Sequence, residues 1–104
     1  MDIKRKRSCE SKAKIFKALA HPTRIFILEE LAKKNKCVCE ITTLVGCDVT
    51  TVSKNLSLMK DAGIIGSYNE INKVFYFLER PCALKFLKFV NEVEYIKLKA
   101  FKAV

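Results

Sequence analysis

Apolar side chains recur at helical spacing through the first third of the chain. Residues 11–20 place apolar residues on one side of a helix and lysines on the other. Residues 21–36 repeat the pattern, with Pro22 at the first helical position, where its missing N–H is harmless, and with Asn35 as a stop. The pattern therefore predicts two successive amphipathic helices.

Two shorter helical segments follow, and a tight turn separates them. Residues 39–46 end at Gly46, whereas residues 49–62 begin after Asp48, a natural N-cap, and stop at Gly63. Two short helices joined in this way are the layout of a helix-turn-helix.

The second of these helices has two different faces. The apolar face is expected to meet the core and consists of Val49, Val52, Leu56 and Met59. The opposite face is small, polar and basic near its start, which suits a major groove, and consists of Thr50, Lys54, Ser57 and Asp61. Lys54 can reach a base edge or a phosphate. Asn55 carries an amide that could pair with adenine, although it lies to one side of this face.

Residues rich in β-branched and aromatic side chains then replace the helical pattern. They predict strands near residues 64–69 and 73–78, joined by a turn around Glu70 to Asn72. At the tip, Asn72 and Lys73 are expected to meet a nucleic-acid backbone or minor groove, with a solvated edge as the alternative.

The last segment, residues 81–101, predicts a long helix opened by Pro81. It carries more apolar surface than a small core can cover, which indicates an interface between two copies of the chain. The predicted fold is mainly α with a β-hairpin: a winged helix-turn-helix that dimerises through its first and last helices. Residues 1–10, with the charge run at 4–7, are expected to form a basic flexible arm, and residues 11–104 the DNA-binding and dimerisation domain.

The net charge indicates a polyanionic partner. The 104 residues include 20 Lys and Arg against 11 Asp and Glu, a net charge of +9. Double-stranded DNA is favoured over an anionic membrane or a solvated surface without a partner. The basic N-terminus leads into no signal-peptide core, and no apolar run approaches the roughly 20 residues of a membrane span. We therefore expect a cytoplasmic protein without a membrane partner.

An enzyme is not expected. The sequence shows no Ser-His-Asp set, Gly-rich phosphate loop or pair of carboxylates, and its one histidine leaves little acid–base capacity.

Five cysteines in a reducing compartment favour metal binding or redox sensing over a disulfide framework. Cys37 and Cys39 flank one valine just before a helix. Residues i and i+2 of a regular helix point about 200° apart, so these thiols can hold one ion only if Cys37 lies outside the helix. A helix N-terminus also favours the thiolate form. Cys47 is expected to be a small buried hydrophobe.

These segments, in this order, resemble the ArsR/SmtB family of metal-sensing repressors. FKALAHPTRIFILEEL resembles the second-helix signature, CVCEI the metal box, DVTTVSKNLSLMKDAGII the recognition helix and NKVFYFL the wing. His21 stands where an Asp is more usual, which implies a weaker helix cap. The resemblance implies a homodimer that binds operator DNA and is released by a toxic thiophilic ion. At the motif positions it implies the DNA-facing residues Thr50, Thr51, Ser53, Lys54 and Asn55.

The resemblance also implies a sensor of the arsenite type. Two sulfurs leave a soft ion unsatisfied, so a third thiolate is needed. Cys9 is favoured because a flexible arm can adapt to a site, in some family members from the other protomer, and Cys82 is the rival. Three thiolates fit As(III) or Sb(III), while lead and cadmium remain open. The ion is an effector, and no constitutive cofactor is expected.

Alternatives to ion sensing remain. On the same fold, oxidation or uptake of sulfane sulfur could switch the protein. A C-x-C pair would make a strained disulfide, so Cys39 paired with Cys9 or Cys82 is favoured there. The two box thiols could also be spectators in a non-switching DNA-binding protein, which the charge alone supports.

Overall fold

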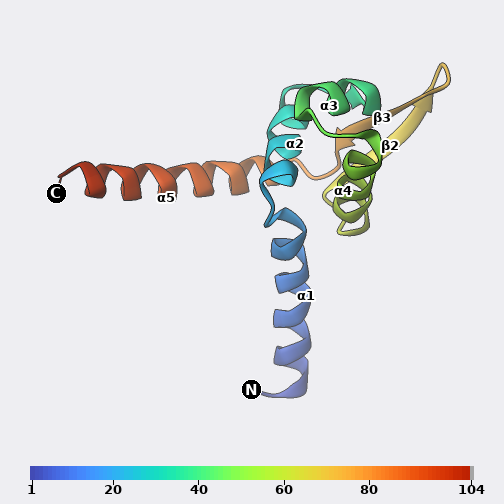
Figure 1. The fold of residues 1–104 in the computed structure, drawn as a ribbon. Helices are drawn as coiled ribbons and strands as arrows, with labels where there is room; N and C mark the ends of the chain where they lie inside the picture. Colours follow the sequence, from blue (N-terminus) through green and yellow to red (C-terminus); the bar gives the residue numbers. More distant parts are fainter. Residues whose placement is uncertain (104) are drawn as a thin grey trace.

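The structure, a computed structural model, describes residues 1–103, and side-chain surroundings as far as Lys99. A three-stranded antiparallel sheet contains β1 (Lys36–Cys37), β3 (Lys73–Leu78) and β2 (Ile65–Glu70) in that order. Figure 1 shows the hairpin of β2 and β3 beside the helices. The predicted winged helix-turn-helix is confirmed. Within the described range, the elements are α1 (Ile3–Leu19), α2 (Pro22–Lys33), β1 (Lys36–Cys37), α3 (Val38–Val45), α4 (Val49–Asp61), β2 (Ile65–Glu70), β3 (Lys73–Leu78) and α5 (Ala83–Ala103).

Local signals set most of these boundaries. Pro22 occupies the first turn of α2, and His21 caps that helix because its Nδ1 accepts the Thr23 N–H at 3.1 Å. The resemblance implied a weaker cap at His21, yet the imidazole supplies the acceptor. Gly46, at φ 78°, ends α3 in the left-handed conformation that glycine adopts without strain. The turn that follows leads directly into α4.

The core lies where α2, α3, α4 and β2 meet. Burying each of its aliphatic side chains contributes about 1.5–3 kcal/mol. The fully buried members are Ile27, Leu28, Ile41, Val52, Leu56, Met59 and Ile65. Val49 was expected on this face, but it is 53% exposed because it stands at the first position of α4, before the helix reaches the core.

The basic N-terminal segment is helical, contrary to the expectation of an arm. Helix α1 begins at Ile3, because no glycine or proline interrupts it and Asp2 caps it by accepting the Arg5 N–H at 2.7 Å. The first residues therefore extend the first helix instead of preceding it.

A two-residue strand that the sequence did not predict precedes α3. Lys36 pairs with Tyr76 and Cys37 with Phe75 across β1 and β3. Lys36 is buried, and its Nζ donates to the Glu30 carbonyl oxygen at 2.8 Å, which ties β1 to the end of α2. The start of α3 is therefore anchored on both sides.

Helices α1 and α5 extend in different directions from the rest of the molecule (Figure 1). Among the described residues of α5, those at its start contact the rest of the domain: Ala83, Phe86 and Leu87 pack against the core, and the Phe16 and Phe86 rings lie 6.0 Å apart. Further along, α5 exposes Phe89, Val93, Tyr95, Ile96 and Leu98. Among the described residues, no helix combines the length and apolar character that a membrane crossing requires.

Candidate nucleic-acid interface and thiol site

The outward face of α4 is polar and open. Thr50, Thr51 and Lys54 are exposed, and Ser53 is half-buried. The two threonines stand in the first turn of a 13-residue helix, where free backbone N–H groups attract phosphate. Thr50, Thr51 and Lys54 are therefore accessible on the helix that the sequence assigned to DNA, whereas Ser53 is partly covered.

Asn55 does not share this position. Its side chain is 7% exposed, and Arg24 Nε donates to its Oδ1 at 2.9 Å. Its Nδ2 donates to the Thr51 carbonyl oxygen, also at 2.9 Å. The amide is thus engaged on both sides, so the structure gives Asn55 a supporting role inside the domain in place of the predicted contact with a base.

Arg24 is the residue of this region that the sequence reasoning missed. Besides Asn55, its Nη1 reaches the Lys17 carbonyl oxygen at 3.1 Å. One guanidinium therefore links the end of α1, the start of α2 and the recognition helix α4. The only sequence signal was an asparagine at the edge of an apolar face, which does not name a partner 31 residues away.

The wing extends away from the helices as a hairpin (Figure 1). Tyr68 stacks on Phe75 with ring centroids 5.5 Å apart, which stiffens the two strands. Asn72 and Lys73 are exposed at its tip, as predicted. Their contact with DNA stays a prediction.

The two box thiols meet at the start of α3. Cys37 is the N-cap in extended conformation, outside the helix, while Cys39 lies in the first turn. Their Cα atoms are 5.4 Å apart, and the structure joins them as a disulfide. The geometric condition for the two sulfurs to meet is therefore fulfilled. The preferred pairing of Cys39 with Cys9 or Cys82 is wrong in this structure, because the bend at Cys37 removes the helical separation between the neighbours.

Cys37 also organises the helix that it caps. Its Sγ accepts the Glu40 N–H at 3.4 Å, and the Glu40 carboxylate accepts the Cys37 N–H at 3.2 Å. This reciprocal pair is a capping box with sulfur in place of a hydroxyl. Cys37 is only 2% exposed, whereas Cys39 is open to solvent. A reagent therefore reaches Cys39 first.

The end of α2 next to this site carries a local ion pair. Lys33 Nζ lies 2.6 Å from a carboxylate oxygen of Glu30. The hydrogen bond from Lys33 lowers the pKa of Glu30 from its ordinary value. The pair lies at the surface and carries little weight for stability.

The remaining thiols do not complete a three-sulfur site within one chain. Cys9 and Cys82 are exposed and free, and among residues 1–103 no cluster of three His, Cys, Asp or Glu side chains is placed to hold a metal ion. Cys47 was expected to be buried in the turn but is exposed, because the turn lies at the surface. The structure thus assembles two of the predicted ligands and leaves the third apart.

Comparisons with known proteins agree with this architecture. The family described as bacterial regulatory protein, arsR family, matches residues 21–67. An uncharacterized HTH-type transcriptional regulator of Methanocaldococcus jannaschii is 35% identical over 85 residues, which cover 81% of this chain and 96% of that protein. The cadmium resistance transcriptional regulatory protein CadC of Listeria innocua is 31% identical over 62% of this chain and 55% of its own length.

A solved structure extends the likeness to nearly the whole chain. It is the homodimeric winged helix-turn-helix DNA-binding domain of a Mycobacterium bovis protein, with a TM-score of 0.85 and 26% identity. The match covers 96% of this chain and 93% of that one. It therefore includes the two projecting helices as well as the central domain.

Proposed function

We propose that this chain is a repressor that a thiophilic ion releases from its operator. The proposal starts from the family: the chain belongs to the arsR family of bacterial regulatory proteins, and it is therefore a DNA-binding transcriptional regulator and not an enzyme. The expected ion is As(III) or Sb(III), and the expected site of action is the cytoplasm. In this proposal Thr50, Thr51, Ser53 and Lys54 face the DNA, with the wing residues Asn72 and Lys73 beside them.

One observation carries the ion-sensing part of the proposal. The bend at Cys37 brings its sulfur to that of Cys39 at the entrance to the helix-turn-helix. Paired soft donors suit a soft ion. CadC of Listeria innocua, which is similar to this chain, is named for resistance to cadmium, another thiophilic ion, and this supports the same class of signal.

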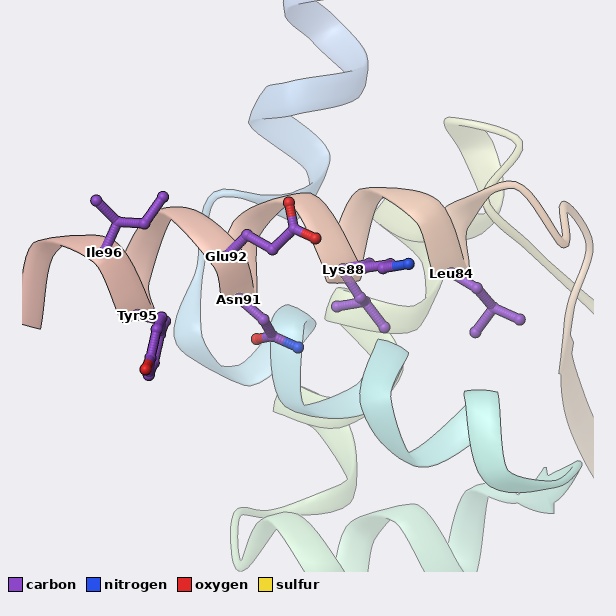
Figure 2. A pocket seen from close by; sticks show the side chains of 7 residues that line it. Leu84, Lys88, Asn91, Glu92, Tyr95 and Ile96 are labelled. Atoms are coloured by element: carbon purple, nitrogen blue, oxygen red, sulfur yellow. The ribbon is translucent and has the colours of Figure 1, made fainter. Parts of the chain in front are cut away.

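The proposed operator-binding form is a homodimer. A groove of about 560 Å³ runs along α5, and its lining combines apolar and polar side chains that recur every three to four residues (Figure 2). The lining residues are Leu84, Leu87, Lys88, Asn91, Glu92, Tyr95 and Ile96. A second copy would cover this stripe, and the homodimeric domain from Mycobacterium bovis supports that arrangement.

A dimer also offers a source for the third thiolate. Cys9 lies on α1, one of the two helices proposed to pair the protomers, and it is exposed. In the proposal, Cys9 from one protomer approaches Cys37 and Cys39 of the other. Cys82, at the start of α5, remains the rival ligand.

Release follows from the double use of the Cys37 sulfur. Once that sulfur binds an ion, the position of the sulfur is set by the ion as well as by the Glu40 N–H, and the N-cap whose geometry then changes contributes about 1 kcal/mol. Helix α3 packs against α4, so a change at its first turn alters the support of the recognition helix. Coupling of about 1–3 kcal/mol between ion and operator is typical of such systems.

The test uses a labelled duplex that the wild-type protein selects from random-sequence DNA. Arsenite is titrated into the complex with a phosphine reductant present, and fluorescence anisotropy reports release. Cys37→Ser and Cys39→Ser should each retain DNA binding and lose release, whereas Cys47→Ser, at an exposed cysteine outside the pair, should behave as wild type. Arsenic-edge X-ray absorption should count three sulfur neighbours. Release that persists in both serine variants would show the proposal to be wrong.

The Cys37–Cys39 pairing also favours a second candidate, a thiol redox switch on the same fold. A mild oxidant would convert the exposed Cys39 to a sulfenic acid, or a polysulfide would convert it to a persulfide. The Cys37 thiol would then attack the Cys39 sulfur and form the disulfide, with water or hydrogen sulfide as the leaving group. Mild oxidant or polysulfide, without any ion, should release the operator and yield a linked Cys37–Cys39 peptide in mass spectrometry. Loss of DNA binding from a chemically unmodified protein would reject this candidate.

A further inference from the structure

The tip of the wing holds an isoleucine in a conformation that isoleucine disfavours. Glu70 and Lys73 are register partners, so Ile71 and Asn72 form a two-residue turn. Their φ angles are 48° and 59°, in the left-handed region. Such turns favour Asn-Gly or similar pairs, and a β-branched residue there is a genuine outlier. Asn72 suits the turn, but Ile71 does not.

Packing does not explain the choice of Ile71. The residue is 87% exposed, so its side chain contributes almost nothing to burial in the fold. An exposed apolar side chain in an unfavourable backbone conformation destabilises the free protein on both counts. Strained residues cluster at functional sites. We therefore expect a contact between Ile71 and a binding partner to offset this loss of stability.

The wing presents this residue on a stiff support. Two six-residue strands carry the tip away from the helices (Figure 1). Near the middle of the hairpin Tyr68 stacks on Phe75, and its ring also lies 6.0 Å from that of Phe77. A side chain held in this way loses little further freedom when it enters a narrow space.

The charges at the tip select the kind of contact. Glu70 faces Lys73 across the turn, so the four tip residues have no net charge. A tip without net charge has little electrostatic attraction for phosphate. What remains is an apolar wedge beside an amide donor, and the minor groove of A·T pairs presents only acceptors. Proteins that bind the minor groove insert isoleucine and similar side chains between base steps.

We propose that Ile71 is an apolar wedge that enters the minor groove next to the sequence read by α4, while the Asn72 amide donates to base acceptors there. The proposal rests on operator binding, as proposed above, and adds a specific minor-groove contact to it. Another protein and a second copy of the chain are the competing occupants of the tip, and the test separates them from DNA.

The decisive variant is Ile71→Gly, because relief of backbone strain should raise its stability, whereas loss of the apolar contact should lower its affinity for DNA. Glycine adopts positive φ freely, so this variant should unfold at a higher denaturant concentration than wild type. It should nevertheless bind the selected duplex about tenfold more weakly, since an apolar contact is lost. Ile71→Asn should behave similarly. Ile71→Leu keeps the wedge without the β-branch and should bind as wild type.

Inosine substitution identifies the groove. Two duplexes are compared in which the wing-facing A·T pairs are replaced by G·C or by inosine·C, because these differ in the minor groove only by the guanine amino group. Wild type should bind the inosine duplex more tightly, and Ile71→Gly should gain less. The proposal would be overturned if Ile71→Gly bound the duplex with wild-type affinity, or if that variant lost both stability and affinity. It would also be overturned if inosine raised the affinity of both proteins equally. If wild type selects no duplex, operator binding itself fails and the wedge fails with it.

Discussion

Arg24 Nε donates to Asn55 Oδ1 at 2.9 Å, and this bond fixes the recognition helix α4 to the start of α2. The same guanidinium holds the Lys17 carbonyl oxygen at the end of α1. Because α1 is one of the two proposed dimer helices, the bond connects the pairing of protomers with the orientation of α4.

The first prediction concerns Asn55→Ala. This variant should lower the free energy of unfolding by about 1–3 kcal/mol, because Arg24 loses a partly buried acceptor. It should also reduce the preference for the selected duplex over random DNA, since α4 is less firmly held. Urea denaturation and competition binding measure the two effects. Ser57→Ala, on the exposed side of α4, should change stability by less than about 0.5 kcal/mol. Unchanged stability in Asn55→Ala would contradict the role of the bond.

The second prediction concerns Lys54, which is exposed on α4. If Lys54 neutralises a phosphate, Lys54→Gln should reduce the slope of log affinity against log salt by about 0.9. Lys60 provides a matched control, because its Nζ is occupied by the Ser67 hydroxyl at 2.7 Å. Lys60→Gln should leave the slope near that of wild type. A relaxed base preference at one position, with the slope unchanged, would instead assign Lys54 to a base edge.

The sequence predicted those features of the fold that local chemistry decides. Pro22, Gly46 and Gly63 marked helix boundaries within a few residues, and apolar periodicity identified Val52, Leu56 and Met59 as core. Such signals act over one or two turns of chain. They were therefore readable without knowing what packs against each element.

Structural features that depend on residues far away in the sequence could not be predicted from the sequence. Strand β1 exists because Lys36 and Cys37 meet β3, about 40 residues later, and two residues carry no period of their own. Asn55 was assigned to DNA from its motif position in the family resemblance, although its amide lay to one side of the polar face, and in the structure this amide bonds to Arg24 and to the Thr51 carbonyl oxygen. The thiol pair was partly predictable, since the meeting of the two sulfurs required only that Cys37 lie outside the helix.

The third prediction separates the two candidates for the third thiolate. Cys9→Ser should lower the arsenic–sulfur count from three to two and weaken arsenite-induced release, because the proposed ligand comes from α1 of the other protomer. Cys82→Ser should leave both measurements unchanged. Arsenic-edge absorption on the two variants makes the distinction. The reverse result would transfer the ligand to the start of α5.

The fourth prediction tests the surface that pairs the protomers. Ile96 is 66% exposed and lines the groove on α5 (Figure 2), so Ile96→Lys should leave the folded domain intact. In a two-fold dimer the substitution occurs twice, and burial of each isoleucine contributes about 1.5–3 kcal/mol, so dimerisation should weaken at least about a hundredfold. Sedimentation equilibrium measures this change.

Affinity for the selected duplex should fall with dimerisation in Ile96→Lys, because two half-sites are no longer read together. Lys85→Gln, an exposed position on α5 outside the groove lining, should remain dimeric. If Ile96→Lys remained dimeric, the groove on α5 would not be part of the dimer interface. If that variant also bound the duplex as wild type does, α1 would have to form the dimer interface alone. The proposed approach of Cys9 to Cys37 and Cys39 of the other protomer would then depend on contacts of α1 and not on those of α5.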